Sequence, residues 1–289
     1  MKKKGICAGI VLYNPDIEGI IENINLVLEQ VEFLIIVDNN SENINEVLKS
    51  VRDLELKNIK VILNKKNEGI AKALNQIVLV ANEMKYEWIL TLDQDSKIKN
   101  GLIKAYIPYL KDDIGQITCL IEDINIGIMH AKDFSGEVRN IERCITSGCL
   151  MNVKACIDVG MFDEKMFIDY VDFDMSFALR EHGYQIIQVN FNGLIHEMGT
   201  SIMIKIGNKE LIVTKHESLI RYFYYARNLT YCIRKHYKKG VLDKKKYILK
   251  LIGRLGAIFF YEDKPMRKVS KYCKGIFYGI KMKVDNNNG

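Results

Sequence analysis

The sequence predicts an α/β protein built on an open, mainly parallel sheet, and two observations in its first hundred residues carry this prediction. Apolar runs typical of buried parallel strands occur four times, at Ile6–Tyr13, Phe33–Val37, Ile59–Leu63 and Trp88–Leu92. Helical patterns of apolar residues separate these runs, at Ile17–Val31, Ile44–Leu54 and Ile70–Met84. Strands that alternate with helices at this spacing are typical of such a sheet.

The middle of the chain is less regular. The segment "CITSGCLMNVKAC" predicts a strand pair or a loop, and "SGEVRN" predicts a turn. Residues 160–184 begin as an acidic loop and continue as a helix, which we expect to end at Gly183 because glycine favours that position. A strand at Gln185–Val189 should follow, and the chain beyond residue 230 has a helical, basic and tyrosine-rich pattern.

The composition is that of a globular protein. The chain has 289 residues, of which 48% are hydrophobic and 27% charged, enough for one large domain or for a catalytic domain with a smaller appendage. The 7 cysteines form no CxxC pair, so we expect reduced, buried thiols rather than disulfides or a thiolate zinc site. No run reaches the roughly 18 apolar residues that a membrane-spanning helix needs.

Charge is distributed unevenly along the chain. From Tyr231 to Gly289 there are 16 Lys and Arg against 4 Asp and Glu, out of 42 and 36 in all, so the first 230 residues carry 26 and 32. An acidic body with a basic end suggests nucleic acid or an anionic membrane as a partner for that end. Within it, apolar residues recur at helical spacing from Tyr247 to Phe259. That helix suits either an anionic membrane surface or packing on the catalytic domain or another subunit, and both interpretations stay open.

Polar residues follow the predicted strands at the points where the strands end. Tyr13, Asp38, Asn67, Asp93 and Asp95 all lie at or shortly after these ends. In parallel α/β sheets the carboxyl ends of the strands share one edge, and ligands bind in the crevice beyond it. We therefore expect these side chains to come together at a binding edge.

The "DQDS" sequence at residues 93–96 predicts a metal site. Neither GxGxxG nor GxxxxGK[ST] follows the first strand, so a bound diphosphate would need another source of positive charge. Mg²⁺ and Mn²⁺ bind nucleotide phosphates through one or two protein carboxylates, which Asp93 and Asp95 supply. A lone DxD is common by chance, and its location after the fourth strand is what favours function here.

Two later segments add acid–base candidates. The stretch "FIDYVDFD" carries Asp169, Asp172 and Asp174; in the first turn of a helix the ionised carboxylate is favoured, as a general base requires. Helix capping explains one of these aspartates and leaves the others unexplained. His196 follows an apolar strand, and a lone histidine is more often structural. Near a carboxylate-bound cation it becomes a third ligand.

An ordered set of motifs resembles the inverting glycosyltransferases of family 2, which have the GT-A fold, and within them the bacterial rhamnosyltransferase branch. The resemblance covers about residues 6–235 and consists of "VLYNPD", "IIVDNNS", "NEGIAKALN", "WILTLDQDS", "TSGCL", "GMFDEKMFIDYVDFDMSFALREHGY", "HEMG" and "RYFYYARN". It implies a GT-A domain over residues 1–230, with a nucleotide-sugar-binding half at about 1–100 and an acceptor half at about 101–230. Residues 231–289 would form a basic helical C-terminal region.

The resemblance also implies residue roles. Asp95 would be the principal metal ligand, with His196 a second. Asp172 would be the general base, with Val171 standing where the family often has glutamate, and Asp169 is the reserve candidate. The remaining nucleotide-sugar-binding positions would be Tyr13, Asp38, Asn67, Asp93, Ser147, Gly148 and Arg180, with Arg180 assisting at the diphosphate.

The implied reaction is a single in-line displacement that inverts the anomeric centre and needs Mg²⁺ or Mn²⁺. The implied donor is dTDP-L-rhamnose, with a UDP-sugar as the alternative, and the acceptor is a saccharide or lipid-linked saccharide of the bacterial cell surface. Such an enzyme would be cytoplasmic, at the inner face of the plasma membrane if the C-terminal helices bind lipid. A sugar-nucleotide pyrophosphorylase would need a Gly-rich, basic loop where "YNPDIEG" stands, and a nucleic-acid-binding protein would leave the strand-end aspartates without a purpose.

Overall fold

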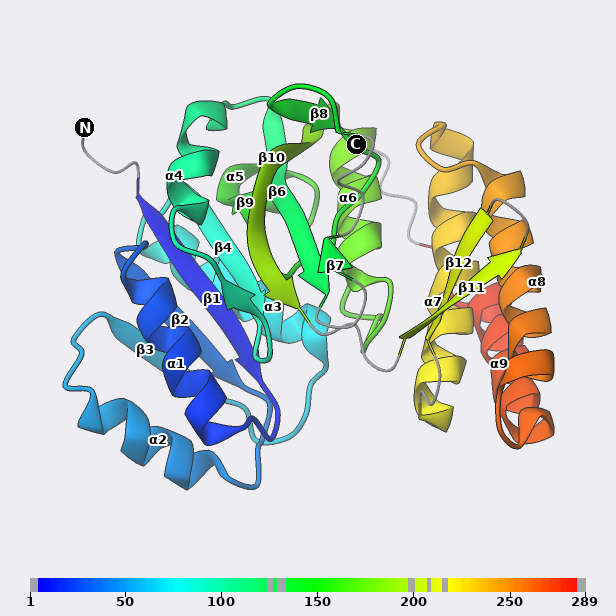
Figure 1. Ribbon diagram of the computed structural model, residues 1–289, viewed down its shortest axis with the longest axis horizontal. Coiled ribbons are helices and arrows are strands. Elements are labelled where there is room, and N and C mark those ends of the chain that lie inside the picture. The colour runs from blue at the N-terminus through cyan, green and yellow to red at the C-terminus, as the bar shows by residue number, and fades with distance from the viewer. Residues whose placement is uncertain are drawn as a thin grey trace.

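The computed structural model describes residues 5–123, 127–128, 134–196, 201–206, 209–214 and 218–284. Its centre is a twisted sheet with helices on both faces, and three further helices stand beside it (Figure 1). Within the described residues the strand order is β3-β2-β1-β4-β9-β6-β10-β5, with β7 beside β6 and β8 beside β10.

The four strands at one side of the sheet run parallel, as the sequence predicts. β1 pairs with β2 and with β4, and β2 pairs with β3. Their bounds are Ile6–Leu12 for β1, Phe33–Asp38 for β2, Ile59–Leu63 for β3 and Trp88–Asp93 for β4. β1 is buried along its whole length, because helices cover both faces of the sheet there.

The other side of the sheet mixes directions. β9 is antiparallel to both β4 and β6, whereas β6 and β10 are parallel to each other and β5 is antiparallel to β10. The bounds are Lys97–Ile98 for β5, Ile114–Asp123 for β6, Gly127–Ile128 for β7, Val138–Asn140 for β8, Cys149–Asn152 for β9 and Gln185–His196 for β10. A separate antiparallel pair joins β11, Ser201–Ile206, to β12, Lys209–Thr214.

Helices cover the two faces of the sheet and bury two apolar clusters. Side chains of α1, α2 and α4 pack on one face, and those of α3, α5 and α6 pack on the other. The bounds are Ile17–Leu28 for α1, Ile44–Asp53 for α2, Ile70–Glu83 for α3, Leu102–Tyr106 for α4, Val153–Asp158 for α5 and Val171–Glu181 for α6. The Asp16 carboxylate caps α1 by accepting the Gly19 N–H at 2.7 Å.

Three C-terminal helices pack side by side: α7 (Leu219–His236), α8 (Lys244–Tyr261) and α9 (Pro265–Lys281). Two glycines let α9 approach α7 closely: a Cβ at Gly275 would lie 2.3 Å from the Phe223 carbonyl oxygen, and one at Gly279 would lie 2.4 Å from that of Arg227. No described helix combines the length and the apolar character needed to cross a bilayer.

A buried ionic network joins α7 to the sheet domain. Asp174 on α6 accepts from Lys235 Nζ at 2.8 Å and lies 2.8 Å from His236 Nε2, whose Nδ1 lies 2.6 Å from Glu181. Burial alone would raise the pKa of Asp174, but Lys235 and His236 lower it to about 2. Asp174 is therefore a structural anchor between the two helices.

The structure corrects two local predictions and confirms a third. Within "CITSGCLMNVKAC" there is one strand, β9, followed directly by α5, because the Asn152 side chain accepts the Ala155 N–H and caps a helix. The strand predicted at Gln185–Val189 continues to His196 as β10, which carries that histidine to the binding edge. The predicted end of α6 is confirmed: His182 is the C-cap, and Gly183 follows in the left-handed conformation with φ 85°.

Candidate active site

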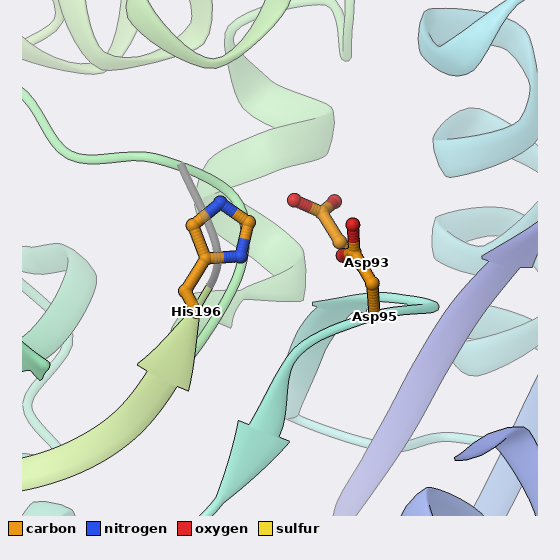
Figure 2. A group of neighbouring side chains, drawn as sticks. All are labelled: Asp93, Asp95 and His196. Carbon is orange, nitrogen blue, oxygen red and sulfur yellow. The ribbon is translucent and has the colours of Figure 1, made fainter. Parts of the chain in front are cut away.

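Three of the predicted residues form a cluster suited to a divalent cation. Asp93 is the last residue of β4, Asp95 lies in the following turn, and His196 is the last residue of β10. One ligand atom from each lies within 4.8 Å of the other two, and Figure 2 shows the three side chains converging. Two carboxylates and an imidazole at one point are a donor set that Mg²⁺ or Mn²⁺ accepts.

The cluster is oriented by a neighbour within the same motif. Ser96 Oγ lies 2.6 Å from His196 Nδ1, which leaves Nε2 for a cation. Burial raises the pKa of Asp93; His196 opposes this effect, Asp95 reinforces it, and Arg221 also opposes it. Because burial disfavours the ionised form of Asp93, a bound cation would stabilise its carboxylate.

The middle residue of the DQD sequence ties this turn to the end of β1. The Tyr13 N–H donates to Gln94 Oε1 at 2.8 Å, and Gln94 Nε2 donates to the Tyr13 carbonyl at 3.2 Å. The Tyr13 side chain is half exposed beside this contact. It is therefore available to stack on a flat ligand such as a nucleoside base.

The segment 146–149 is bound to β4 through several hydrogen bonds. Thr91 Oγ1 donates to the Thr146 carbonyl at 2.6 Å, the Gly148 N–H donates to the Thr91 carbonyl at 2.9 Å, and the Asp93 N–H donates to Ser147 Oγ at 3.1 Å. Gly148 has φ 70°, a conformation that favours glycine. Ser147 and Gly148 therefore hold the strand end that carries Asp93, and Ser147 itself is fully buried.

One cavity is lined both by Asp93 of the metal cluster and by the predicted general base. Its volume is about 230 Å³, and its lining includes Asp93, Thr146, Asp169, Asp172 and Arg221. The two aspartates predicted for different halves of the chemistry, Asp93 and Asp172, thus face the same space.

Asp172 lies in the first turn of α6, and its carboxylate accepts the Phe173 N–H at 2.8 Å. Burial is the largest influence on its pKa; the Phe173 N–H opposes it, the carboxylates of Asp93 and Asp169 add to it, and the pKa rises to about 7. A carboxyl group with a pKa near neutrality is suited to accept a proton from a sugar hydroxyl.

The loop before Asp172 has an uncommon backbone. Asp169 and Tyr170 have φ 67° and 66°, in the left-handed region that non-glycine residues rarely adopt. The fully buried Asn228 holds them there, because its Nδ2 donates to the Ile168 and Asp169 carbonyls at 2.8 Å each. Arg221 Nη2 contacts Asp169 Oδ1 at 2.8 Å. Asp169 is thus an ion-pair partner on the cavity wall.

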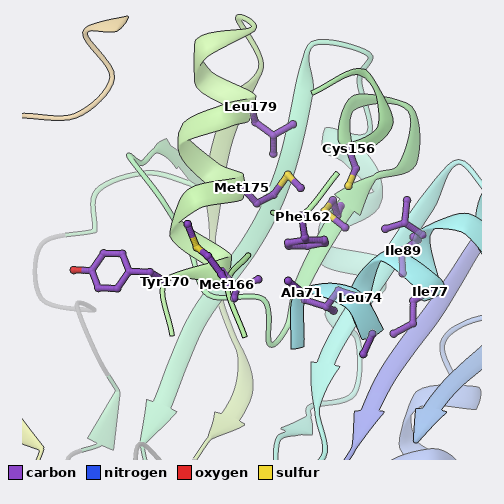
Figure 3. Close-up of a cluster of buried hydrophobic side chains, with 14 of the residues drawn as sticks. Ala71, Leu74, Ile77, Ile89, Cys156, Phe162, Met166, Tyr170, Met175 and Leu179 are labelled. Carbon is purple, nitrogen blue, oxygen red and sulfur yellow. The ribbon is translucent and has the colours of Figure 1, made fainter. Parts of the chain in front are cut away.

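Figure 3 shows how the core supports this loop. Met166, Tyr170 and Met175 belong to the apolar cluster that packs α6 and the preceding loop against α3 and the sheet. Tyr170 is buried and packs edge-on against Phe173 and Tyr225, with ring centroids 5.3 Å apart in both pairs. The position of Asp172 is therefore set by packing on both sides of it.

Asp38 and Asn67 serve the loops that contain them. Asp38 is buried at the end of β2, and its carboxylate accepts the N–H groups of Asn40 at 2.9 Å and Ser41 at 3.0 Å. Asn67 Oδ1 accepts the Gly69 N–H at 3.0 Å, just before α3. Both lie at the strand-end edge, where they shape the turns beside β1.

Arg180 lies apart from these residues. Its Nη1 donates to the Val241 carbonyl at 2.8 Å, and the residue lines a different cavity, together with Glu142 and Tyr184. The arginine that lines the cavity of Asp93 and Asp172 is Arg221. Arg221 and Asn228 are the first and last residues of the "RYFYYARN" motif. The sequence therefore marked this segment, but it did not indicate the role of either residue.

Comparisons with known proteins agree with this geometry. The model of glycosyl transferase family 2 matches residues 7–147. The dTDP-rhamnosyl transferase RfbF of Shigella flexneri is 27% identical over 267 residues, which are 86% of each chain. S. aureus TarS 1-349 has a TM-score of 0.65 at 12% identity, covering 95% of this chain and 80% of that one; this chain spans 44% of the longer TarS chain. The mannosyltransferase PcManGT of Pyrobaculum calidifontis, solved with GDP-Man and Mn²⁺, has a TM-score of 0.59 at 13% identity, covering 97% and 76%.

The fold is that of the GT-A glycosyltransferases, which confirms the predicted fold class. The match to the family 2 model and to RfbF confirms the resemblance drawn from the ordered motifs. It is an enzyme that transfers a sugar.

Proposed function

We propose that this glycosyltransferase inverts the anomeric centre in one step, with Asp95 and His196 holding Mg²⁺ or Mn²⁺ and Asp172 acting as the general base. The observation that carries the proposal is the single cavity lined by both Asp93 and Asp172. A cation site and a base that face one space suit a reaction in which a hydroxyl attacks while a diphosphate leaves.

The residues of the chain would divide the work as follows. Asp172 accepts the proton of the acceptor hydroxyl as its oxygen attacks the anomeric carbon, so no covalent enzyme intermediate forms. Asp95 and His196 hold the cation beside Asp93, with His196 oriented through Ser96. When bound, the cation supplies charge neutralisation for the departing nucleoside diphosphate.

We propose the remaining predicted residues for the donor pocket. Tyr13 would stack on the nucleoside base, and Asp38 and Asn67 would shape the loops around it. Arg221 replaces Arg180 as the proposed cationic contact for the donor, because Arg221 lines the shared cavity and influences the pKa of Asp93.

The proposed donor is dTDP-L-rhamnose, and the proposed acceptor is a saccharide or lipid-linked saccharide of a bacterial cell-surface polysaccharide. Support for the donor comes from RfbF, which is described as a dTDP-rhamnosyl transferase and matches 86% of this chain. A UDP-sugar is the second candidate, because the similar structure of S. aureus TarS 1-349 was also solved in complex with UDP.

We also propose that the C-terminal region touches the inner face of the plasma membrane. Apolar side chains of α8 and α9 are exposed beside their lysines, among them Leu249, Phe260 and Met266 at 67%, 77% and 69%. Exposed apolar area bordered by cations suits an anionic lipid surface. Residues 1–230 and 231–289 remain our proposed division of the chain, with the helix α7 crossing that boundary.

A thermal-shift series with nucleoside diphosphates and nucleotide sugars tests the function. We expect stabilisation by dTDP or UDP that requires Mg²⁺ or Mn²⁺ and is lost in Asp95→Asn. Asp172→Asn should retain that stabilisation and lose sugar transfer. Equal stabilisation in the presence of EDTA would contradict the metal-dependent mechanism, and transfer at the normal rate by Asp172→Asn would reassign the base.

A further inference from the structure

Helix α8 carries a row of cations, two of which contact aromatic residues that line the active-site cavity. Lys246, Lys250 and Arg254 are spaced four residues apart and therefore lie along one side of the helix. Exposed apolar residues such as Leu249 and Phe260 lie elsewhere on its surface. The basic residues of α8 thus have a different environment from its exposed apolar stripe.

Lys250 and Arg254, together with Arg143, lie over aromatic rings that line the cavity of Asp172. The Arg143 guanidinium is 4.4 Å from the centroid of Phe173, and Lys250 Nζ is 6.0 Å from the same centroid. Lys250 Nζ is also 5.6 Å from the Tyr170 ring, and Arg254 is 5.8 Å from that of Tyr225. Phe173, Tyr170 and Tyr225 all line the cavity.

Two of these cations, Lys250 and Arg143, have no carboxylate in direct contact among the described residues. Among the described residues, no carboxylate lies within 4.0 Å of Lys250 Nζ or of the Arg143 guanidinium, whereas Lys246 is paired with Glu142 at 3.2 Å. Partial burial lowers the pKa of Lys250 to about 8, with Arg143 the next contributor and Asp172 acting in the opposite direction. Cations that repel each other beside a cavity are relieved by an anionic ligand.

We propose that Arg143, Lys250 and Arg254 form a site for the phosphate or diphosphate group of the acceptor. The inference builds on the proposed function, in which Asp172 deprotonates that acceptor. Cations from two separate elements suit a ligand with more than one negative charge, as a diphosphate has.

The location favours the acceptor over the donor. The rings that the cations contact belong to the segment around Asp172, to α7 and, for Arg143 over Tyr247, to α8, and none belongs to residues 93–96 or to His196. The charge of the donor's diphosphate would already be neutralised by the cation proposed at the cluster of Asp93, Asp95 and His196. A carrier phosphate held beside Asp172 would present the attached sugar hydroxyl to the base.

The test is calorimetric titration of the full chain with inorganic pyrophosphate in EDTA, so that no divalent cation takes part. We expect binding by the wild type, a loss of about tenfold or more in Lys250→Gln, and retention in Lys250→Arg. Lys245→Gln is the matched control, because Lys245 is exposed on another side of the same helix, and it should bind normally. Thermal melting of each variant verifies folding.

Further measurements separate this site from the donor site and from lipid binding. Asp95→Asn should keep its affinity for pyrophosphate in EDTA while it loses metal-dependent stabilisation by dTDP or UDP. This variant therefore distinguishes a failure of the proposed function from a failure of the phosphate site. Sedimentation with phosphatidylglycerol vesicles should be unchanged in Lys250→Gln. Wild-type affinity in Lys250→Gln, absence of binding in the wild type, an equal loss of nucleotide binding, or an equal loss of vesicle binding would each overturn the assignment.

Discussion

Replacing Asn228 with alanine should disable the base while leaving the donor site intact. Asn228 is fully buried, and its Nδ2 donates to two carbonyls, those of Ile168 and Asp169, at 2.8 Å each. These bonds hold Asp169 and Tyr170 in the left-handed conformation, where each non-glycine residue stores about 1–3 kcal/mol of strain. Without the amide the loop can relax, and Asp172 follows it.

The magnitude follows from the two lost bonds. Each contributes about 1–1.5 kcal/mol net, so the native loop conformation loses about 2–3 kcal/mol. Since 1.36 kcal/mol is a factor of ten, the population of the competent loop falls by about 30- to 160-fold. We expect kcat for transfer to fall by that factor, with the Kd for the nucleoside diphosphate unchanged.

The assay is single-turnover transfer alongside nucleotide binding by calorimetry. Asn75→Ala is the matched control: Asn75 is also buried, and its Nδ2 donates to the Phe162 carbonyl and the Glu164 carboxylate at 3.0 Å each, at the end of the loop that is farther along the chain from the base. It should lower the free energy of unfolding with kcat nearly preserved. A normal kcat in Asn228→Ala, or a parallel loss in Asn75→Ala, would refute the reasoning.

Three further predictions concern the site and its frame. The pKa of Asp172 is raised to about 7 and the base must be ionised, so kcat/KM should fall as the pH drops below about 7. A bound cation would move this fall to lower pH. A kcat/KM that stays constant from pH 5 to 8 would argue against Asp172 as the base. Ser96→Ala should weaken Mn²⁺ binding by about 10-fold or more, measured by calorimetry, since His196 loses its 2.6 Å partner; unchanged affinity would remove His196 from the ligand set. Gly69→Ala should lower the free energy of unfolding in urea by about 2 kcal/mol or more, because φ is +86° and the new Cβ would lie 2.7 Å from the Phe167 carbonyl oxygen; wild-type stability would show that the loop yields freely.

Much of the first half of the fold could be predicted from the sequence. The four parallel strands have apolar runs, and polar residues lie at or shortly after their ends, so their direction and their common edge follow from periodicity and topology. The strand β9 could not be predicted in the same way. It has only four residues, Cys149–Asn152, and it is inserted antiparallel between β4 and β6 by contacts distant in sequence.

The charged members of the site were easier to predict than their supports. Asp93, Asp95 and Asp172 are conspicuous in the sequence because a carboxylate beside a buried strand or among aromatic residues is costly unless it has a partner or a ligand. The hydrogen bonds of Gln94, Ser96 and Asn228 cross distances in sequence that no local pattern encodes.

The arginines show the same limit. Arg180 and Arg221 both lie on helices, and periodicity alone does not indicate which of two long side chains reaches a given cavity. The structure separates them, since Arg221 lines the cavity of Asp172 and Arg180 lines another.

The junction at the start of α3 has a consequence for protein engineering. The Ile70 N–H donates to the Phe167 carbonyl at 2.8 Å, and Gly69 packs against the same residue. The first turn of a helix from the N-terminal half is thus completed by a loop from the other half. Chimeras that exchange donor specificity between related enzymes would need to transplant the 162–170 loop together with α3. A chimera that takes only one of them would lose the matched contact of Phe167 with Gly69 and Ile70.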